Sequence, residues 1–198
     1  MNDSATTRSS LLLRVRDAQD EEAWRQFVDI YAPLVYGFAR RQGLQDADAA
    51  DVTQDVLLAV NGAIGRFDYD SERGSFRTWL YTVARSKLNT FLARRQRQCQ
   101  GTGDTSAHEL LKEQPAPEDA DRRWEEEYER RLFTWAAEQV RGSFQDSTWQ
   151  AFWQTAVEGK SGQEVARRLG LTVAAVYLAK GRVMARLKEQ IQQVRDEE

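Results

Sequence analysis

The chain of 198 residues has little cysteine, histidine or proline: one, one and three residues respectively. A single thiol, Cys99, excludes an internal disulfide and is typical of a reducing compartment. Because His108 is the only imidazole, a structural zinc site is not expected, and the sequence predicts no metal and no cofactor. A phosphate-binding loop and a nucleophile elbow are also missing, so an enzyme is the least favoured class of protein.

Long hydrophobic runs are absent as well. No stretch approaches the roughly 20 apolar residues that a membrane-spanning helix needs. The first residues, MNDSATTRSSLLLRVRD, lack the apolar core of a signal peptide. We therefore expect a cytoplasmic protein that does not insert into a membrane.

What the sequence does contain is helical periodicity. Hydrophobic residues make up 41% of the chain and charged residues 30%, while strand-like alternation of β-branched residues is missing, so the composition predicts an all-α protein. Residues 99–121 combine Gly, Pro, Ser, Thr and acidic residues, which is typical of a flexible linker. We expect this linker to join two small helical domains, residues 11–98 and 122–195.

Charge is distributed in zones, although the formal net charge is only −3. Residues 66–98 carry eight basic and three acidic side chains, and residues 158–190 carry seven basic and three acidic ones. Between them, residues 99–129 carry ten acidic and three basic side chains. Basic zones of this kind are typical of surfaces that bind phosphates. The acidic zone is either a solvated tether or a shield for those surfaces.

Residues 161–187 are predicted to form two short amphipathic helices joined by a tight turn. Ser161 and Glu164 have the spacing of a capping box, Gly170 is placed to end the first helix, and Thr172 is placed to cap the second. The side chains of the second helix expected in the core are those of Val173, Val176, Val183 and Leu187.

The opposite face of that second helix combines small or apolar residues with cations. Small residues let a backbone approach a DNA groove closely, and cations reach the phosphates. The pattern therefore predicts a helix-turn-helix that binds duplex DNA. The candidate DNA-contacting residues are Thr172, Ala174, Ala175, Tyr177, Leu178, Lys180, Gly181, Arg182 and Arg186.

The first domain contains three segments of helical periodicity, residues 21–43, 46–68 and 76–97. Pro33 indicates a kink or a break inside the first segment. The second segment has a polar face that could simply be solvated, but it includes one apolar residue, Leu58, which indicates a docking surface. The residues of this face are Asp51, Gln54, Asp55, Leu58 and Asn61.

The third segment is basic, with no acidic residue between Arg73 and Gln98. Cations interleaved with aromatic residues suit a single strand of nucleic acid, because cations hold phosphates while rings or pockets accept unstacked bases. Aromatic residues at helical spacing are more often plain core, and we apply that interpretation to Trp79 and Phe91. The candidate strand-binding residues of this segment are Arg77, Trp79, Arg85, Lys87, Arg94 and Arg95.

Together these segments resemble the extracytoplasmic-function (ECF) group of bacterial RNA polymerase sigma factors, a group of the sigma-70 family. DAADVTQDVLLAV is similar to the family motif D-A-E-D-L-x-Q-E-x-F, and FRTWLYTVAR is similar to F-R-x-W-L-x-x-I-A-R. The resemblance covers roughly residues 11–97 and 124–194.

The resemblance implies a role for each segment. The face of the second segment would dock on the clamp helices of the largest polymerase subunit, and the C-terminal hairpin would bind the −35 element as duplex. The basic helix would help to melt the −10 element, and the loop before it would capture a flipped base, which adds Asp70, Arg73 and Ser75 to the candidates. The implied partners are core RNA polymerase, through its clamp helices and flap region, promoter DNA, and an anti-sigma factor.

The sequence departs from the family pattern at two places. Ser86 and Thr90 stand where the family has Asn and Asp, and Tyr177 and Leu178 stand where it often has Lys or Arg. The promoter sequences are therefore not implied by the resemblance.

Two other classes of protein remain open from the residues alone. A stand-alone helix-turn-helix regulator would account for the second domain but not for the Asp51–Leu58 face or the basic helix. A helical module that only binds partner helices would tolerate substitution of Arg182 or Arg85.

Overall fold

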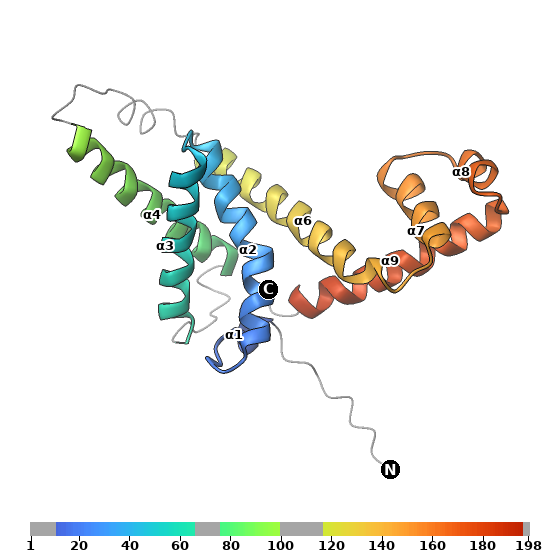
Figure 1. Cartoon of the computed structure of the whole chain (residues 1–198), viewed down its shortest axis with the longest axis horizontal. Helices are drawn as coiled ribbons and strands as arrows, with labels where there is room; N and C mark the ends of the chain where they lie inside the picture. The colour runs from blue at the N-terminus through green and yellow to red at the C-terminus, as the bar shows by residue number, and fades with distance from the viewer. Residues whose placement is uncertain (1–10, 66–75, 100–116, 196–198) are drawn as a thin grey trace, which may run out of the picture. The chain divides into compact units, whose positions relative to one another are not determined.

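The computed structural model describes residues 11–65, 76–99 and 117–195. Every regular element in these ranges is a helix, which confirms the all-α prediction. The elements are α1 (Leu11–Val15), α2 (Glu21–Arg41), α3 (Asp46–Ile64), α4 (Phe76–Cys99), α6 (Pro117–Arg141), α7 (Asp146–Phe152), the π-helical turn η2 (Trp153–Val157), α8 (Gly162–Leu169) and α9 (Val173–Arg195) (Figure 1). No helix of the described ranges combines the length and the apolar character needed to cross a bilayer.

The described residues form two compact units whose boundary falls inside α6. The first unit extends to Arg131, and the second begins at Leu132. The sequence predicts a second domain that begins at residue 122, whereas in the structure the first half of α6 packs into the first unit. Most of the predicted linker, residues 100–116, lies outside the described residues.

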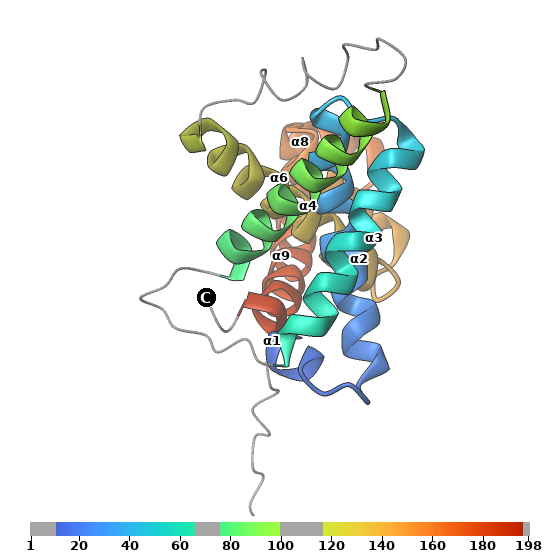
Figure 2. The same cartoon turned by 90° about the vertical axis from the view of Figure 1, so that its left-hand side faces the viewer.

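In the first unit α3 packs against both α2 and α4, as Figure 1 and Figure 2 show, and α1 packs against α2. Of the kink or break predicted at Pro33, the break is wrong, because α2 continues through the proline. Tyr31, Leu34 and Val35 are buried on both sides of the proline. Their burial offsets the roughly 3 kcal/mol that an internal proline costs a helix.

The first half of α6 completes the core of the first unit with two aromatic side chains. Trp124 is only 2% exposed, and its ring lies 5.7 Å from that of Phe38 and 5.4 Å from that of Tyr81. Tyr128 is buried and stacks on Tyr31 at 5.8 Å. Burial of an aromatic side chain is among the largest single contributions to packing, so this half-helix belongs to the first unit energetically as well as spatially.

A carboxylate on the same half-helix is surrounded by arginines. The side chain of Glu127 is 6% exposed and pairs with Arg131 at 2.8 Å, with Arg41 at 3.5 Å, and with Arg130. Burial raises the pKa of Glu127, but hydrogen bonds from Arg130 and Arg131 outweigh burial, so the pKa lies below its ordinary value of 4.5. The carboxylate therefore stays ionised at neutral pH and joins α6 to α2.

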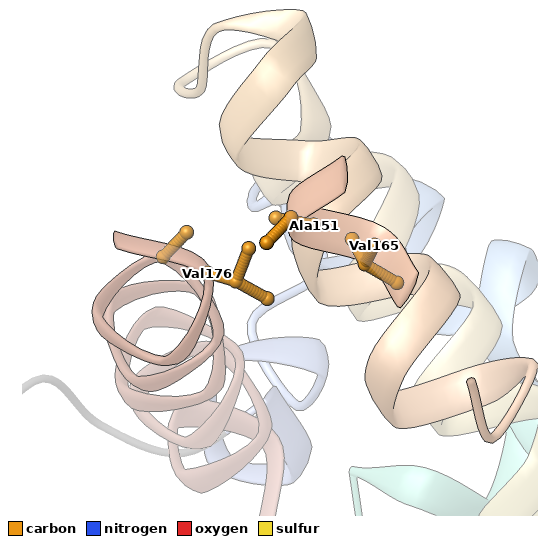
Figure 3. Close-up of a cluster of buried hydrophobic side chains, with 5 residues drawn as sticks. Ala151, Val165 and Val176 are labelled. Carbon is orange, nitrogen blue, oxygen red and sulfur yellow. The ribbon is translucent and has the colours of Figure 1, made fainter. Parts of the chain in front are cut away.

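The second unit is built around residues from two short helices, α7 and α8, and the long helix α9. Ala151 of α7, Val165 of α8 and Val176 of α9 meet in one buried cluster, shown in Figure 3. The second half of α6 buries an apolar stripe in this unit, made up of Leu132, Trp135, Ala136 and Val140. The prediction that Val173 is core is wrong, because its side chain is exposed at the start of α9. Val157, whose helical spacing also favours a core position, is exposed at the end of η2.

Ser147, a residue type that favours the N-cap position, does not cap α7, so an N-cap expected there from the sequence is wrong. Helix α7 begins at Asp146, and Gln145 occupies the N-cap position without a side-chain hydrogen bond. A capping preference for serine identifies a helix start only to within a residue or two, because the packing of Trp149 and Phe152 also selects where the helix begins.

Replacing Trp124 with alanine should lower the free energy of unfolding by about 3–5 kcal/mol, since it empties a buried aromatic site. Chemical denaturation followed by far-UV circular dichroism measures this loss. Trp24→Ala is the matched control, because Trp24 is a partly exposed tryptophan of the same unit and should cost less. A loss below about 1 kcal/mol for Trp124→Ala would show that α6 does not complete this core.

Glu127→Gln should destabilise the chain by about 1–3 kcal/mol near neutral pH, because it removes the charge of a buried carboxylate that pairs with three arginines. The folded pKa of Glu127 is depressed, so its contribution is present above the unfolded pKa and is lost as the pH falls through the folded pKa. The difference in unfolding free energy between wild type and variant should therefore narrow as the pH is lowered from 7 toward about 3.

Glu126→Gln is the control for that pH series. Its carboxylate is exposed and pairs with the exposed Arg122 on the same helix, so its effect should be small throughout. If the difference in unfolding free energy between wild type and Glu127→Gln does not change with pH, the depressed pKa of Glu127 is contradicted.

Candidate functional site

The predicted docking face lies on the exposed side of α3. The opposite side of the helix packs into the first unit through Ala49, Val52, Thr53, Val56, Val60 and Ile64. Asp51, Gln54, Asp55 and Asn61 are exposed, and Leu58 is 62% exposed. Neither Asp51 nor Asp55 has an ion pair within the described residues. The structure thus brings all five predicted residues together as one acidic surface with an apolar centre.

The cations of α4 do not share a single face. Lys87 is partly exposed and Arg94 is exposed, and their separation of seven residues places them on the same side of the helix. Arg85 is also exposed but projects from a different side. Arg95 is held by an ion pair with Asp48 of α3. Only part of the predicted strand-binding set is therefore directed into solvent.

Arg77 is the least accessible of these cations. Its side chain is 16% exposed, and its Nη1 lies 3.2 Å from Glu125 and 3.7 Å from Glu129, both on α6. The guanidinium carbon lies 4.7 Å from the centre of the Tyr128 ring. A DNA contact by Arg77 remains a prediction, and phosphate would compete there with two carboxylates.

The remaining candidates of the −10 set differ in position. Trp79 is partly buried, with its ring 5.4 Å from that of Phe76, as expected for a residue that contributes to the core. Asp70, Arg73 and Ser75 lie outside the described residues.

The turn between α8 and α9 is determined by short-range hydrogen bonds and one glycine. The Ser161 hydroxyl accepts a hydrogen bond from the Glu164 backbone amide at 3.2 Å, as the spacing predicts. Gly170 ends α8 with φ of 67°, a left-handed conformation that favours glycine. The Thr172 hydroxyl then accepts from the Ala175 amide at 3.1 Å at the start of α9.

The outer face of α9 carries the predicted DNA-contacting residues. The buried face consists of Val176, Ala179, Val183, Leu187 and Val194. The residues directed to solvent are Thr172, Ala174, Tyr177, Leu178, Gly181, Arg182 and Arg186, while Ala175 and Lys180 are partly exposed. Arg186 pairs with Glu189 at 3.0 Å, whereas Lys180 and Arg182 have no ion pair within the described residues.

Each unit also has a surface cavity. In the first unit, a cavity of about 550 Å³ at the α1–α2 turn includes Asn61, so it adjoins the docking face. In the second unit, a groove of about 400 Å³ lies between α6 and α7. Its apolar lining comes from Phe133, Ala137, Trp149 and Trp153.

Sequence reasoning missed the residues that hold Arg77. The charge pattern predicts only that Glu125 and Glu129 belong to an acidic zone, and it predicts no contact between them and Arg77. It also predicts no core position for the aromatic residues beside them. The signal was present, since Trp124, Tyr128 and Leu132 recur at intervals of four and continue the apolar stripe of α6 toward its start.

The part of the chain that carries the predicted docking face matches a known protein family. Residues 27–98 match the family described as Sigma-70 region 2. This match spans α3 entirely, α4 except for its last residue, and most of α2.

Curated relatives extend the similarity over the rest of the chain. RNA polymerase sigma factor CnrH of Cupriavidus metallidurans is 29% identical over 174 residues, which is 85% of this chain and 86% of that protein. RNA polymerase sigma factor NccH of Alcaligenes xylosoxydans xylosoxydans is 28% identical over 177 residues, 87% of this chain and 89% of that protein. ECF RNA polymerase sigma factor RpoE of Cereibacter sphaeroides is 33% identical over 78 residues, 39% of this chain and 42% of that protein.

The solved structure of CnrH in complex with the cytosolic domain of CnrY is similar as well, at 23% identity and a TM-score of 0.35, over 92% of this chain and 95% of that one. The family match and the three sigma-factor relatives agree with the motifs of α3 and α4. Residues 27–98 thus belong to the Sigma-70 region 2 family, and the chain is similar over most of its length to RNA polymerase sigma factors.

Proposed function

We propose that this chain binds core RNA polymerase and directs promoter-specific initiation, with the −35 element bound as duplex and the −10 element as a melted strand. As a sigma factor it acts in transcription initiation, as a regulatory protein. The observation that supports this proposal is the presence of two different surfaces, one in each unit. An acidic face with an exposed leucine occurs in the first unit, and a cationic helical hairpin occurs in the second.

The polymerase-binding surface is the face of α3. Its carboxylates, at Asp51 and Asp55, have no ion pair within the described residues, so they can pair with cations of a partner. Leu58 adds apolar area at the centre, where burial contributes most to affinity. These features support docking on the polymerase clamp helices.

Strand binding at the −10 element is assigned to the exposed cations of α4. Arg85, Lys87 and Arg94 are the residues best placed to contact phosphates, because Arg77 and Arg95 already have carboxylate partners. Each phosphate contact would release counterions and make binding weaker as salt increases. The residues before α4 that the family resemblance adds remain predictions.

Duplex binding at the −35 element is assigned to the outer face of α9. The first turns of such a helix contact base edges while cations further along contact phosphates. Arg182 is exposed and without an ion pair within the described residues, which supports a phosphate contact. Contact with the polymerase flap and control by an anti-sigma factor remain predictions of the family resemblance.

A stand-alone helix-turn-helix regulator is the alternative. It would use the α8–α9 hairpin in the same way but would require no polymerase. The match of residues 27–98 to a sigma region favours the proposal over this alternative, because a stand-alone regulator has no use for the α3 face.

Run-off transcription tests the proposal directly. Core polymerase from a bacterium that carries this chain is incubated with fragmented genomic DNA, with and without the chain. We expect discrete transcripts that require the chain, and aligning their start sites identifies both promoter elements. If the core does not bind the chain at all, the stand-alone regulator becomes the preferred interpretation.

Asp55→Arg should abolish binding to core polymerase while leaving the helix content unchanged, because it reverses a charge on an exposed position of α3. Co-purification with core polymerase measures binding, and circular dichroism checks the fold. Asp29→Arg is the matched control, since it makes the same charge change at an exposed position of α2. Normal binding by Asp55→Arg would remove the α3 face from the interface.

A further inference from the structure

The start of α9 exposes apolar side chains that the core does not use. Leu178 is 63% exposed and Tyr177 is 57% exposed, while Val176 and Ala179, which flank this pair in the sequence, are buried. Ala174 and Gly181 complete the exposed stripe at helical spacing. In this stripe only the Tyr177 hydroxyl is polar, which is unusual for the solvent side of a helix.

Cations surround this apolar stripe. Arg182 lies one turn beyond Leu178 on the same side of α9, and Lys180 lies three residues beyond Tyr177. On α8, Arg167 and Arg168 are both exposed. An apolar centre with a cationic rim is complementary to a DNA major groove, where phosphates border the edges of the bases.

Tyr177 is held in place by a close approach to α8. A Cβ atom built on Gly162 would lie 2.8 Å from Tyr177 Cζ and 2.9 Å from its hydroxyl oxygen, closer than real contacts allow. The ring therefore lies against the backbone at the start of α8, in space that the absent side chain of Gly162 leaves open. Because this contact restricts the ring, Leu178 and Ala174 remain the apolar positions that can approach a base edge.

We propose that this chain recognises its −35 element through the C5-methyl groups of thymines, contacted by Leu178 with Ala174, and not through guanines contacted by arginine or lysine. The inference rests on the proposed function, in which α9 enters the major groove. The commonest specific contact in that groove is a bidentate one from Arg or Lys to guanine, and the exposed stripe has neither residue. Apolar side chains contact the thymine methyl group instead.

The experiment uses promoter fragments identified by run-off transcription, with each −35 thymine replaced in turn by deoxyuridine. This replacement removes only the methyl group and leaves base pairing intact. Holoenzyme reconstituted with wild-type chain should bind at least one uridine fragment about fourfold more weakly, the effect expected for burying one methyl group. Holoenzyme with Leu178→Ala should bind the thymine and uridine fragments alike.

Two controls separate the possible results. Leu178 is exposed, so thermal unfolding of Leu178→Ala should match wild type. Arg182→Ala should weaken binding of thymine and uridine fragments by the same factor, because a phosphate contact carries no base information.

Equal binding of both fragments by wild type, or a −35 element without thymine, would overturn the inference while leaving the sigma function intact. If the chain neither binds core polymerase nor supports transcription, the proposed function is wrong. The inference, which rests on that function, is then wrong as well.

Discussion

The first unit depends on an aromatic cluster where α2, α4 and α6 meet. Phe27 and Tyr31 of α2 contact Phe76 of α4, with ring centres 5.8 Å and 5.5 Å apart. Tyr128 of α6 stacks on Tyr31, so three helices share one apolar centre. Because burying aromatic side chains is favourable and offset or edge-on ring contacts add to it, this cluster determines which faces of the helices remain outside. Because α3 packs against α2 and α4, the helices that hold this cluster, its opposite face remains exposed.

The position of α6 changes the meaning of the acidic zone. Its aromatic residues anchor the first half of the helix in the first unit, and this brings Glu125 and Glu129 to Arg77. Part of the acidic charge is therefore structural, since it neutralises a cation at the start of α4. Competition between these carboxylates and nucleic-acid phosphate links the packing of α6 to the chemistry proposed for α4.

The second unit depends more on local determinants. Ser161 and Thr172 cap their helices, and Gly170 provides the left-handed residue between them. Since these features act over three or four residues, the sequence predicts the hairpin without any information on tertiary contacts. The buried cluster around Val176 then determines which side of α9 faces solvent, and so which residues can contact DNA.

Helical spacing in the sequence by itself determined the helical class, the exposed face of α3 and the outer face of α9. The reason is that the buried residues of an amphipathic helix recur every three to four positions. Tertiary structure decided what spacing cannot encode. Contacts between residues far apart in the chain brought Arg77 to Glu125 and placed Trp124 in the first unit. The continuity of α2 through Pro33 is a similar case, since burial on both sides outweighs a local preference to break. A sequence records the preferences of each segment, whereas the partner of each side chain follows from how the segments pack.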